Sequence, residues 1–451
     1  MAQIQVFRGK QIGGCITVIT CEIAGRTSRI MIDYGANLPG SEAADEYQYP
    51  WEEMPVDAVL FTHYHGDHAG RILEIPAYIP LYMGAAAREI MMNIERALAN
   101  AKGEDAEAHQ KLLEILEDEN RVRTFVKKKY GYQRVDEIPG FRIEPYMVDH
   151  SAYDAYMFLV EAENTEKEYG YDVILHTGDF RGHGRRGKAI LPVIETYVLK
   201  KGRRKVDTLI IEGTMMGRLA EKVLTEQEMQ LKATKILKDH RYAFLICSST
   251  NLDSLAGFYQ AAQEAAKPYQ RYFYTYSEYC RVQLEAFTKL AGSYSEVYQF
   301  ENVFRLNLEK MLKSEKWAQD KSQKEFMEER GFLALIKPED FCEKYIDVFL
   351  QDYEAGCIKE KPVIIYSMWD GYVKEGNKAA NRAWIEFLRK QQAKGVEIIP
   401  LHTSGHATAQ MLTDVINAVN PREEIVPIHT EFAEKFQELE ISEELKQKIR
   451  K

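Results

Sequence analysis

The chain has little of what marks a secreted or membrane-spanning protein. Its 451 residues include six cysteines, and no two of them form a Cys-x-x-Cys pair. No apolar run reaches the roughly 20 residues that a transmembrane helix needs. The N-terminus reads as a strand and lacks the apolar core of a signal peptide. These absences argue against a disulfide scaffold and a membrane partner, and they predict a cytoplasmic protein with reduced thiols.

An excess of positive charge is also absent, because the formal net charge is −10 at pH 7. The total charge therefore gives no sign of nucleic-acid binding, although the local field at a cleft matters more than the sum. No internal repeat, low-complexity tract or long Pro/Gly linker interrupts the sequence. With 45% hydrophobic and 28% charged residues, the composition is that of a soluble enzyme. The length suggests two or three domains.

The densest cluster of chemically useful side chains is Thr62-His63-Tyr64-His65-Gly66-Asp67-His68. It follows the apolar run 56–61, which predicts a strand that ends at the cluster. Neutral imidazole nitrogens and carboxylate oxygens are good ligands for zinc and related transition metals. Because one tetrahedral ion rarely takes so many ligands from a single loop, we expect a two-metal site. A surface loop with chance histidines is the alternative interpretation.

Four further motifs place single carboxylates or histidines beside predicted strands. In chain order they are Ile32-Asp33-Tyr34-Gly35, Val148-Asp149-His150-Ser151, Leu175-His176-Thr177-Gly178-Asp179-Phe180 and Val426-Pro427-Ile428-His429. Each motif is weak alone, since a solitary histidine or aspartate beside a strand is usually structural. Together with the histidine-rich segment, and in this order, they resemble the metal-site motifs of the metallo-β-lactamase fold.

That resemblance implies a ligand set for two zinc ions, with manganese as the alternative metal. The ligands of the first ion would be His63, His65 and His150. Those of the second ion would be Asp67, His68 and His429, with Asp179 bridging the two. For Asp33 we expect a structural role, as an anchor of the histidine-rich loop.

The predicted elements of the first half suit an αββα sandwich with the metals at strand ends. Residues 16–22 and 28–33 read as paired strands, and 171–176 and 206–211 read as buried strands. Residues 84–128 have the helical period throughout.

The pattern of predicted elements changes near Glu212, after which strands and amphipathic helices alternate. Strands are predicted over 242–247, 271–276 and 362–367, and helices over 252–266, 278–290 and 377–392. Such alternation indicates parallel βαβ units. Because the metal motifs lie on both sides of this region, we predict an α/β domain (213–397) inserted into the first domain, which would comprise 1–212 and 398–451.

Three motifs around this insertion resemble those of the β-CASP nucleases, and ribonuclease J with its shorter relatives most of all. Ile210-Ile211-Glu212-Gly213-Thr214 is similar to the acidic motif A of that group, and Leu401-His402-Thr403-Ser404-Gly405-His406-Ala407 to motif B. Ile428-His429-Thr430-Glu431 is similar to motif C. The resemblance implies hydrolysis of RNA phosphodiester bonds, in endonuclease or 5′-exonuclease mode, at a site between the two domains. It implies single-stranded RNA as the partner and leaves a homodimer open.

The predicted chemistry assigns roles to residues around the metals. A metal-bound hydroxide would attack the phosphorus, and Asp67 could orient the attacking water. His406 is the candidate acid for the leaving 3′ oxygen, and Glu212 would hold it in place. Contacts to phosphate are expected from Ser404, from the N–H of Gly405 and from a basic segment directly after Asp179, whose arginines are Arg181, Arg185 and Arg186. The alternative interpretations are a plain strand-to-helix turn at Ser404 and Gly405, and a solvated loop at the arginines.

Three other functions remain open at this point. The first is a DNA nuclease of the same family, although histidine at the motif C position is more similar to the RNA-processing members. The second is a small-molecule ester or thioester hydrolase, which would lack the inserted domain and motif B. The third is a non-catalytic RNA-binding subunit, which would have lost metal ligands.

Overall fold

The computed structural model describes residues 2–38, 47–101, 105–129, 131–267, 271–291, 296–312, 316–318 and 321–450. The chain divides into two compact units. We call Met1–Val223 with Gly405–Lys451 the split unit, and Leu224–Ser404 the inserted unit. The divisions expected from sequence, after residues 212 and 397, come earlier in the chain than the observed boundaries, which follow Val223 and Ser404.

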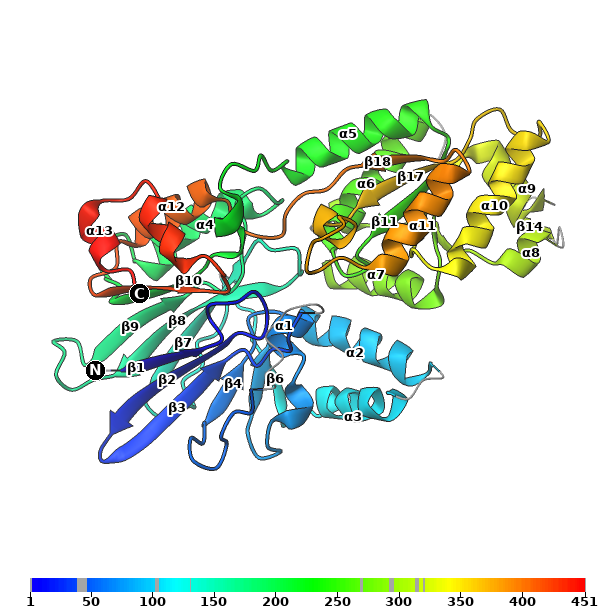
Figure 1. Ribbon diagram of the computed structural model, residues 1–451. Coiled ribbons are helices and arrows are strands. Elements are labelled where there is room, and N and C mark those ends of the chain that lie inside the picture. Colours follow the sequence, from blue (N-terminus) through cyan, green and yellow to red (C-terminus); the bar gives the residue numbers. More distant parts are fainter. Residues whose placement is uncertain are drawn as a thin grey trace. The chain divides into compact units, whose positions relative to one another are not determined.

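The split unit is an αββα sandwich, as predicted, in which two sheets face each other (Figure 1). The first sheet has the order β1-β2-β3-β4-β5-β6. Its strands are β1 Gln3–Phe7, β2 Ile16–Ile23, β3 Arg26–Ile32, β4 Ala58–Leu60, β5 Leu81–Met83 and β6 Val122–Thr124. The second sheet has the order β19-β10-β9-β8-β7. Its strands are β7 Phe141–Val148, β8 Ala155–Glu163, β9 Tyr171–His176, β10 Thr208–Glu212 and β19 Glu424–Ile428.

Helices cover the outer faces of both sheets. Along the first sheet lie α2 Ala85–Ala99 and α3 Ala106–Glu117, and the short α1 Gly66–Ala69 follows β4 (Figure 1). Against the second sheet pack α4 Ile190–Val193, α12 Ala409–Val419 and α13 Glu443–Gln447. The helical prediction for 84–128 is wrong at its end. There the β-branched pair Val122 and Thr124 belongs to β6, which pairs with β5.

The sequence of β8 shows why the two layers form. Tyr156, Phe158 and Val160 pack between the sheets. Met157 and Leu159, which alternate with them, pack beneath the helices of the second sheet. A strand buried on both faces needs a continuous apolar run, and this one has it.

The topology brings distant motifs to one edge of the second sheet. Strand β10 pairs in parallel with both β9 and β19. Parallel neighbours place their carboxyl ends at the same edge, where ligands of α/β sheets usually bind. Asp179, Glu212 and His429 follow or end these three strands, so the fold gathers them at that edge.

The inserted unit has a six-stranded, wholly parallel sheet of order β13-β12-β16-β11-β17-β18, which confirms the predicted βαβ units. Its strands are β11 Tyr242–Cys247, β12 Tyr272–Thr275, β13 Val303–Arg305, β16 Phe332–Ile336, β17 Val363–Ser367 and β18 Glu397–Pro400. A separate two-stranded sheet consists of β14 Lys316–Ala318 and β15 Lys321–Ser322. The helices are α5 Glu226–Asp239, α6 Leu252–Ala266, α7 Glu278–Ala291, α8 Leu308–Leu312, α9 Gln323–Arg330, α10 Asp340–Glu354 and α11 Arg382–Ala393.

Two features of this unit differ from the sequence prediction. The predicted boundary after residue 397 would place most of β18 in the first domain, but this strand pairs with β17 at the edge of the inserted sheet. The predicted helix 377–392 begins only at Arg382, because Asn381 caps it by accepting a hydrogen bond from the Trp384 backbone N–H. Within the described ranges, no helix is long and apolar enough to cross a membrane.

Candidate metal centre

Backbone hydrogen bonds hold the histidine-rich loop against the turns after β1 and β3. The Gly14 N–H donates to the Asp67 carbonyl (3.2 Å), and the Tyr34 N–H donates to the His68 carbonyl (2.8 Å). Gly35 lies so close that a Cβ there would be 1.6 Å from the Asp67 carbonyl oxygen. A side chain at this position would therefore collide with the backbone of the loop that carries Asp67 and His68.

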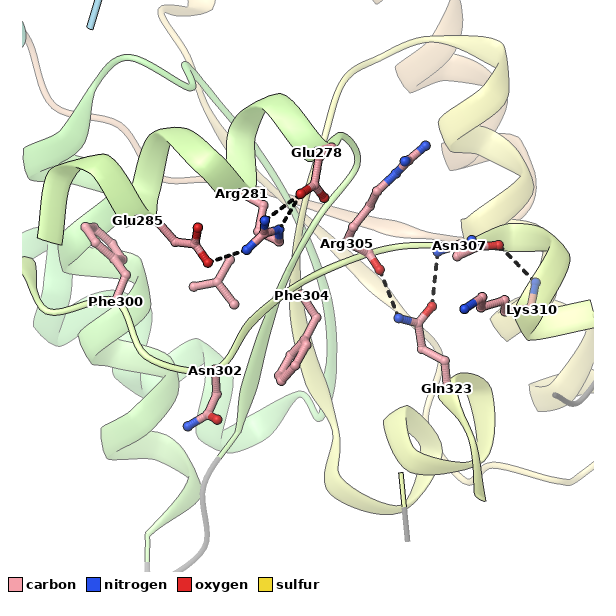
Figure 2. Close-up of a pocket in the computed structure, with 11 residues that line it drawn as sticks. Glu278, Arg281, Glu285, Phe300, Asn302, Phe304, Arg305, Asn307, Lys310 and Gln323 are labelled. Atoms are coloured by element: carbon pink, nitrogen blue, oxygen red, sulfur yellow. Dashed lines mark hydrogen bonds and ion pairs between the residues drawn. The ribbon is translucent and has the colours of Figure 1, made fainter. Parts of the chain in front are cut away.

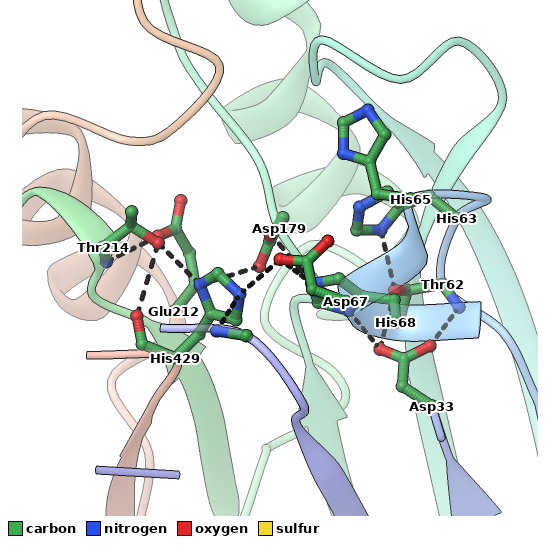
Figure 3. Close-up of polar contacts among 12 residues, drawn as sticks. Asp33, Thr62, His63, His65, Asp67, His68, Asp179, Glu212, Thr214 and His429 are labelled. Atoms are coloured by element: carbon green, nitrogen blue, oxygen red, sulfur yellow. Dashed lines mark hydrogen bonds and ion pairs between the residues drawn. The ribbon is translucent and has the colours of Figure 1, made fainter. Parts of the chain in front are cut away.

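Asp33 anchors the same loop through its side chain. Its carboxylate accepts hydrogen bonds from the Thr62 N–H (2.7 Å) and the Thr62 hydroxyl (2.8 Å). A carboxylate oxygen also lies 2.8 Å from Nδ1 of His68, which leaves Nε2 of His68 directed away from Asp33 (Figure 3). The predicted role of Asp33 as a structural anchor is thus confirmed.

The structure brings together the three residues that were expected to bind the first metal. One side-chain nitrogen from each of His63, His65 and His150 lies within 4.8 Å of the other two. His150 Nε2 is 3.3 Å from His65 Nδ1. The Gly405 carbonyl accepts from His150 Nδ1 (2.7 Å), and the Thr62 hydroxyl is 3.0 Å from His63 Nδ1. These outer partners orient the rings, as they do around metals in general.

The residues expected to bind the second metal also converge. Donor atoms of Asp67, His68 and His429 lie within 4.8 Å of one another, and His429 Nε2 is 3.2 Å from Asp67 Oδ2 (Figure 3). The Thr214 hydroxyl lies 2.8 Å from Nδ1 of His429, and the Gly13 N–H donates to Nε2 (3.2 Å). His429 has a backbone φ of 53°, a conformation that is uncommon for any residue but glycine.

Asp179 lies between the two sets. Its Oδ2 is 3.2 Å from His68 Nε2, and its Oδ1 is 4.0 Å from His429 Nδ1. It also forms a candidate donor group with His63 and His68. Both carboxylate oxygens are buried and have no hydrogen-bond partner among the residues that the structure describes.

The chemistry of this cluster fits a transition metal. Nε2 of His63 is buried without a hydrogen-bond partner in the described ranges, and a buried polar atom of that kind is costly unless something binds it. Burial holds the pKa of His63 well below its usual value and lowers that of His65 to about 4. Their rings are therefore neutral, which is the form that binds metals. Several nitrogens with few oxygens favour zinc over calcium or magnesium.

The charge balance points the same way. Burial opposes ionisation of Asp67 and Asp179, but the neighbouring histidines hold the pKa of both carboxyl groups below the usual range. Burial also opposes a charged His68, yet Asp179, Asp33 and Asp67 together raise its pKa well above the usual value. A buried group of carboxylates thus demands positive charge at this point, which a metal cation would supply.

His406 lies beside the cluster with Glu212 behind it. Glu212 is fully buried and accepts hydrogen bonds from the backbone N–H groups of Thr214 and Ala407, both at 2.9 Å. His406 Nδ1 is 3.5 Å from Glu212 Oε1 and 3.6 Å from Asp179 Oδ2. Burial opposes charge on His406, but Glu212 and Asp179 raise its pKa above the usual value. Its side chain remains 22% exposed, so a substrate can reach this potential proton donor.

The basic segment after Asp179 differs from the prediction at Arg181. This side chain is fully buried, and its Nε lies 3.3 Å from Oδ1 of Asp149, which is buried as well. Asp149 also accepts from the Arg186 backbone N–H (3.1 Å). A phosphate therefore cannot reach the Arg181 side chain, which forms a buried ion pair with Asp149 in the core. Arg185 and Arg186 are only partly buried, and the Arg186 guanidinium lies 4.8 Å from the Tyr153 ring centroid.

The motif B residues Ser404 and Gly405 were expected to contact phosphate. Ser404 is buried and is the last residue of the inserted unit. A Cβ on Gly405 would lie 2.5 Å from the Ser151 hydroxyl oxygen, so glycine is needed there for close packing. The clearest role of Gly405 is its carbonyl bond to His150, and a phosphate contact from either residue stays a prediction.

Sequence reasoning missed several groups that hold the site in place. Thr214 stands within motif A, two residues after Glu212, yet it received no role. The Gly13 N–H and the Thr62 hydroxyl were missed as well. A hydroxyl next to a predicted ligand was the available signal for Thr62 and Thr214, whereas a backbone N–H carries no signal of its own.

Two family models match parts of the chain. Residues 16–121 match the metallo-beta-lactamase superfamily, and residues 395–450 match the zinc-dependent metallo-hydrolase RNA specificity domain. No curated protein matches the chain.

A solved structure shares the fold over nearly the whole chain, and two others match less than half of it. A protein of unknown function from Enterococcus faecalis V583 is 17% identical, with a TM-score of 0.61, over 97% of this chain and 96% of that one. MEM-A1, a subclass B3 metallo-beta-lactamase from a soil metagenome library, is 14% identical over 46% of this chain and 74% of its own, with a TM-score of 0.27. Zinc-bound PqqB from Methylobacterium extorquens is 15% identical over 44% and 60%, with a TM-score of 0.26. By the two family models, the chain carries one segment that matches a metallo-β-lactamase domain and another that matches a zinc-dependent metallo-hydrolase RNA specificity domain.

Proposed function

We propose that the chain is a ribonuclease of the β-CASP type that hydrolyses RNA phosphodiester bonds with two zinc ions. The observation that carries the proposal is the convergence of two donor sets on Asp179, which lies between them, with the His406–Glu212 pair beside them. RNA is the substrate class because residues 395–450, which include His406 and His429, match an RNA specificity domain.

The residues divide the work between metal binding and proton transfer. One ion would be held by His63, His65 and His150, and the other by Asp67, His68 and His429, with Asp179 shared between them. Zinc bound there supplies Lewis acidity toward a phosphate oxygen and lowers the pKa of water toward 7. Manganese is the alternative metal.

His406 acts on the leaving group. Cleavage of the P–O3′ bond leaves negative charge on the 3′ oxygen, and the protonated His406 donates a proton to it. Glu212 favours that protonated form and positions the ring, while its own carboxylate is fixed by two backbone N–H groups. The second oxygen of Asp67 accepts a hydrogen bond from the attacking water and aligns it with phosphorus.

Arg185 and Arg186 bind the phosphates of the RNA strand. They occupy a segment that Asp149 and Arg181 hold in place directly after Asp179. Phosphate contacts of this kind make affinity fall with salt. Changing both arginines to Ala should weaken RNA binding and reduce its salt dependence while the metal content stays intact. An unchanged salt slope would place the RNA groove elsewhere.

The decisive experiment incubates the metal-analysed protein with RNA and DNA of the same sequence, each labelled at the 5′ or the 3′ end. We expect close to two equivalents of transition metal and cleavage of RNA in preference to DNA. The two labels separate internal cleavage from removal of single nucleotides. Preferential cleavage of DNA would identify a DNA nuclease instead, and activity only on small esters would identify a small-molecule hydrolase. If the protein held fewer than about half an equivalent of metal, and added zinc or manganese did not restore cleavage, the proposed metal site would be refuted.

The role of His406 has a separate test. His406→Ala should keep both metals, since the proposed ligand sets are complete without it. Single-turnover cleavage of RNA should slow about 10²-fold or more, while esters with good leaving groups, which need no proton, should suffer much less. Glu212→Gln should show a milder form of the same pattern. Loss of metal in His406→Ala would instead make it a ligand, in the group that it forms with His150 and Asp179.

A further inference from the structure

A pocket in the inserted unit has charges of both signs on its walls (Figure 2). Arg281 of α7 pairs with Glu278 at 2.5 Å and with Glu285, both from the same helix. These three charges are paired with one another within the helix. The Arg305 side chain behaves differently, because it points away from Gln323 and Lys310 (Figure 2). It is exposed, and no described residue forms an ion pair with it.

Arg305 belongs to a row of side chains at one edge of the inserted sheet. It ends β13, Tyr276 directly follows β12, and Lys337 directly follows β16. These three strands are neighbours and run in parallel, with Thr275 opposite both Arg305 and Leu335. The carboxyl edge therefore presents two cations with an aromatic ring on the strand between them. Ligands of parallel α/β sheets bind outside this edge.

A second aromatic ring extends the row. Phe341, near the start of α10, lies with its ring centroid 6.1 Å from that of Tyr276 at an interplanar angle of 49°. Its side chain is 41% exposed, although a phenyl ring in water is unfavourable. The Lys337 Nζ stands 5.5 Å above the Tyr276 ring. The outer surface of Phe341 is thus open, while Tyr276 and Lys337 support it from within.

We propose that this edge, formed by Tyr276, Arg305, Lys337 and Phe341, binds single-stranded RNA. A base stacks on the exposed ring of Phe341, and Arg305 and Lys337 contact the phosphates on either side. Stacking rings combined with cations that follow the backbone are the usual means of holding single strands without reading sequence. The inference rests on the proposed ribonuclease function, since it names how the same substrate is held.

The nearby acids do not cancel this charge. Glu278 is engaged by Arg281, and Glu339 lies 3.9 Å from the Lys337 Nζ at an exposed position where the attraction is weak. The Arg305 side chain is exposed, so a phosphate can reach it. A protein partner would gain little from two separated cations, whereas a polyanion with flat bases matches both features.

The test measures RNA affinity in full-length protein that also carries His65→Ala, so that the probe stays intact. The probe is single-stranded RNA with one 2-aminopurine, whose fluorescence falls when the base stacks. Phe341→Ala should lower affinity about tenfold and abolish the quenching, because a stacked base is worth roughly 1–3 kcal/mol. Its salt dependence should be unchanged. Arg305→Ala should reduce the salt slope by about one instead.

Two variants guard the interpretation. Phe341→Trp keeps a stacking surface and should restore both affinity and quenching. Tyr169→Ala removes an aromatic side chain that is 78% exposed in the split unit, and it should change neither. Unchanged affinity and quenching in Phe341→Ala would overturn the proposal even if the enzyme cleaves RNA. Conversely, a protein that binds RNA through Phe341 but never cleaves it would refute the ribonuclease function alone.

Discussion

Among the described residues, buried polar atoms without hydrogen-bond partners occur in both units, but they are arranged differently. In the split unit they belong to His63 and Asp179 among others, and these converge on one point with other ionisable donors. In the inserted unit they include the side-chain amides of Gln283 and Gln391, on α7 and α11, both fully buried. A missing partner alone therefore does not mark a site, because an isolated amide simply destabilises the fold. Convergence of several titratable donors is what indicates a bound ion.

The largest effect is expected from breaking the convergent cluster. His65→Ala removes one ligand of the first set, so metal content should fall and RNA cleavage should drop by more than the roughly 10–100-fold that loss of an outer partner costs. Metal analysis and cleavage assays on the same preparation check this. His109→Ala is the matched control, since that histidine pairs with Glu95 on the outer helices and should leave both quantities intact. If His65→Ala held as much metal as the wild type, the converging donors of the split unit would not be a metal site, and the contrast with the isolated amides would fail.

A smaller effect should follow from disturbing an outer partner of the cluster. Asp33→Asn preserves the shape of the side chain, and asparagine tolerates the φ of 62° at this position. It removes the negative charge facing His68, so metal affinity or activity should fall about 10–100-fold. Asp57→Asn is the control. That carboxylate also accepts from a backbone N–H, of Arg29, and from a hydroxyl, of Ser28, but it lies outside the donor sets. If both substitutions weakened metal binding equally, the effect would be one of general stability.

Replacing an isolated buried amide should stabilise the protein, whereas the substitutions at the metal cluster should reduce metal binding and activity. Gln391→Met replaces an unpartnered amide by an apolar side chain of similar length, so the free energy of unfolding should rise by about 1 kcal/mol. Denaturant unfolding of the metal-free protein measures it. Gln392→Met, at the exposed neighbouring position, should change little. A clear loss of stability in Gln391→Met would mean that a bound water or another group satisfies this amide.

The smallest effect concerns an acidic pair in the inserted unit. Burial and the neighbouring Asp352 raise the pKa of Glu328 to about 7, so the folded state holds the proton more tightly than the unfolded chain does. The corresponding stability is complete below about pH 4.5 and is lost as the pH rises through about 7. Glu328→Gln should flatten the pH dependence of unfolding between about pH 5 and about pH 8. An identical slope in wild type and variant would show that Glu328 is ionised throughout that range.

The sequence predicted the donor residues because their types are uncommon and adjoin apolar strands. His63, Asp179 and His429 could be found in this way. The groups that orient them could not, since a glycine N–H or a threonine hydroxyl looks the same whether or not it faces a ligand. The burial of Arg181 could not be predicted either. Its charged motif suggested an exposed side chain, but the guanidinium is buried and pairs with Asp149.

Elements were predictable where periodicity was long and continuous. The boundaries of β11 and α6 agree with the structure to the residue. Short strands were harder, because three or four residues carry no period. Thus Val122–Thr124 was included in a predicted helix, and residues 398–400 of β18 were assigned to the first domain although the strand pairs with β17. Pairing partners are a property of tertiary contacts, which a local pattern does not encode.

The place of His429 in the chain has a consequence for the order in which the molecule matures. Its strand, β19, pairs with β10, and the whole inserted unit separates the two in sequence. A contact between such distant segments forms slowly and late. On the ribosome, the nascent chain can assemble the His63–His65–His150 set long before β19 has been made. The second donor set exists only after that strand has docked, so a partly synthesised chain lacks it.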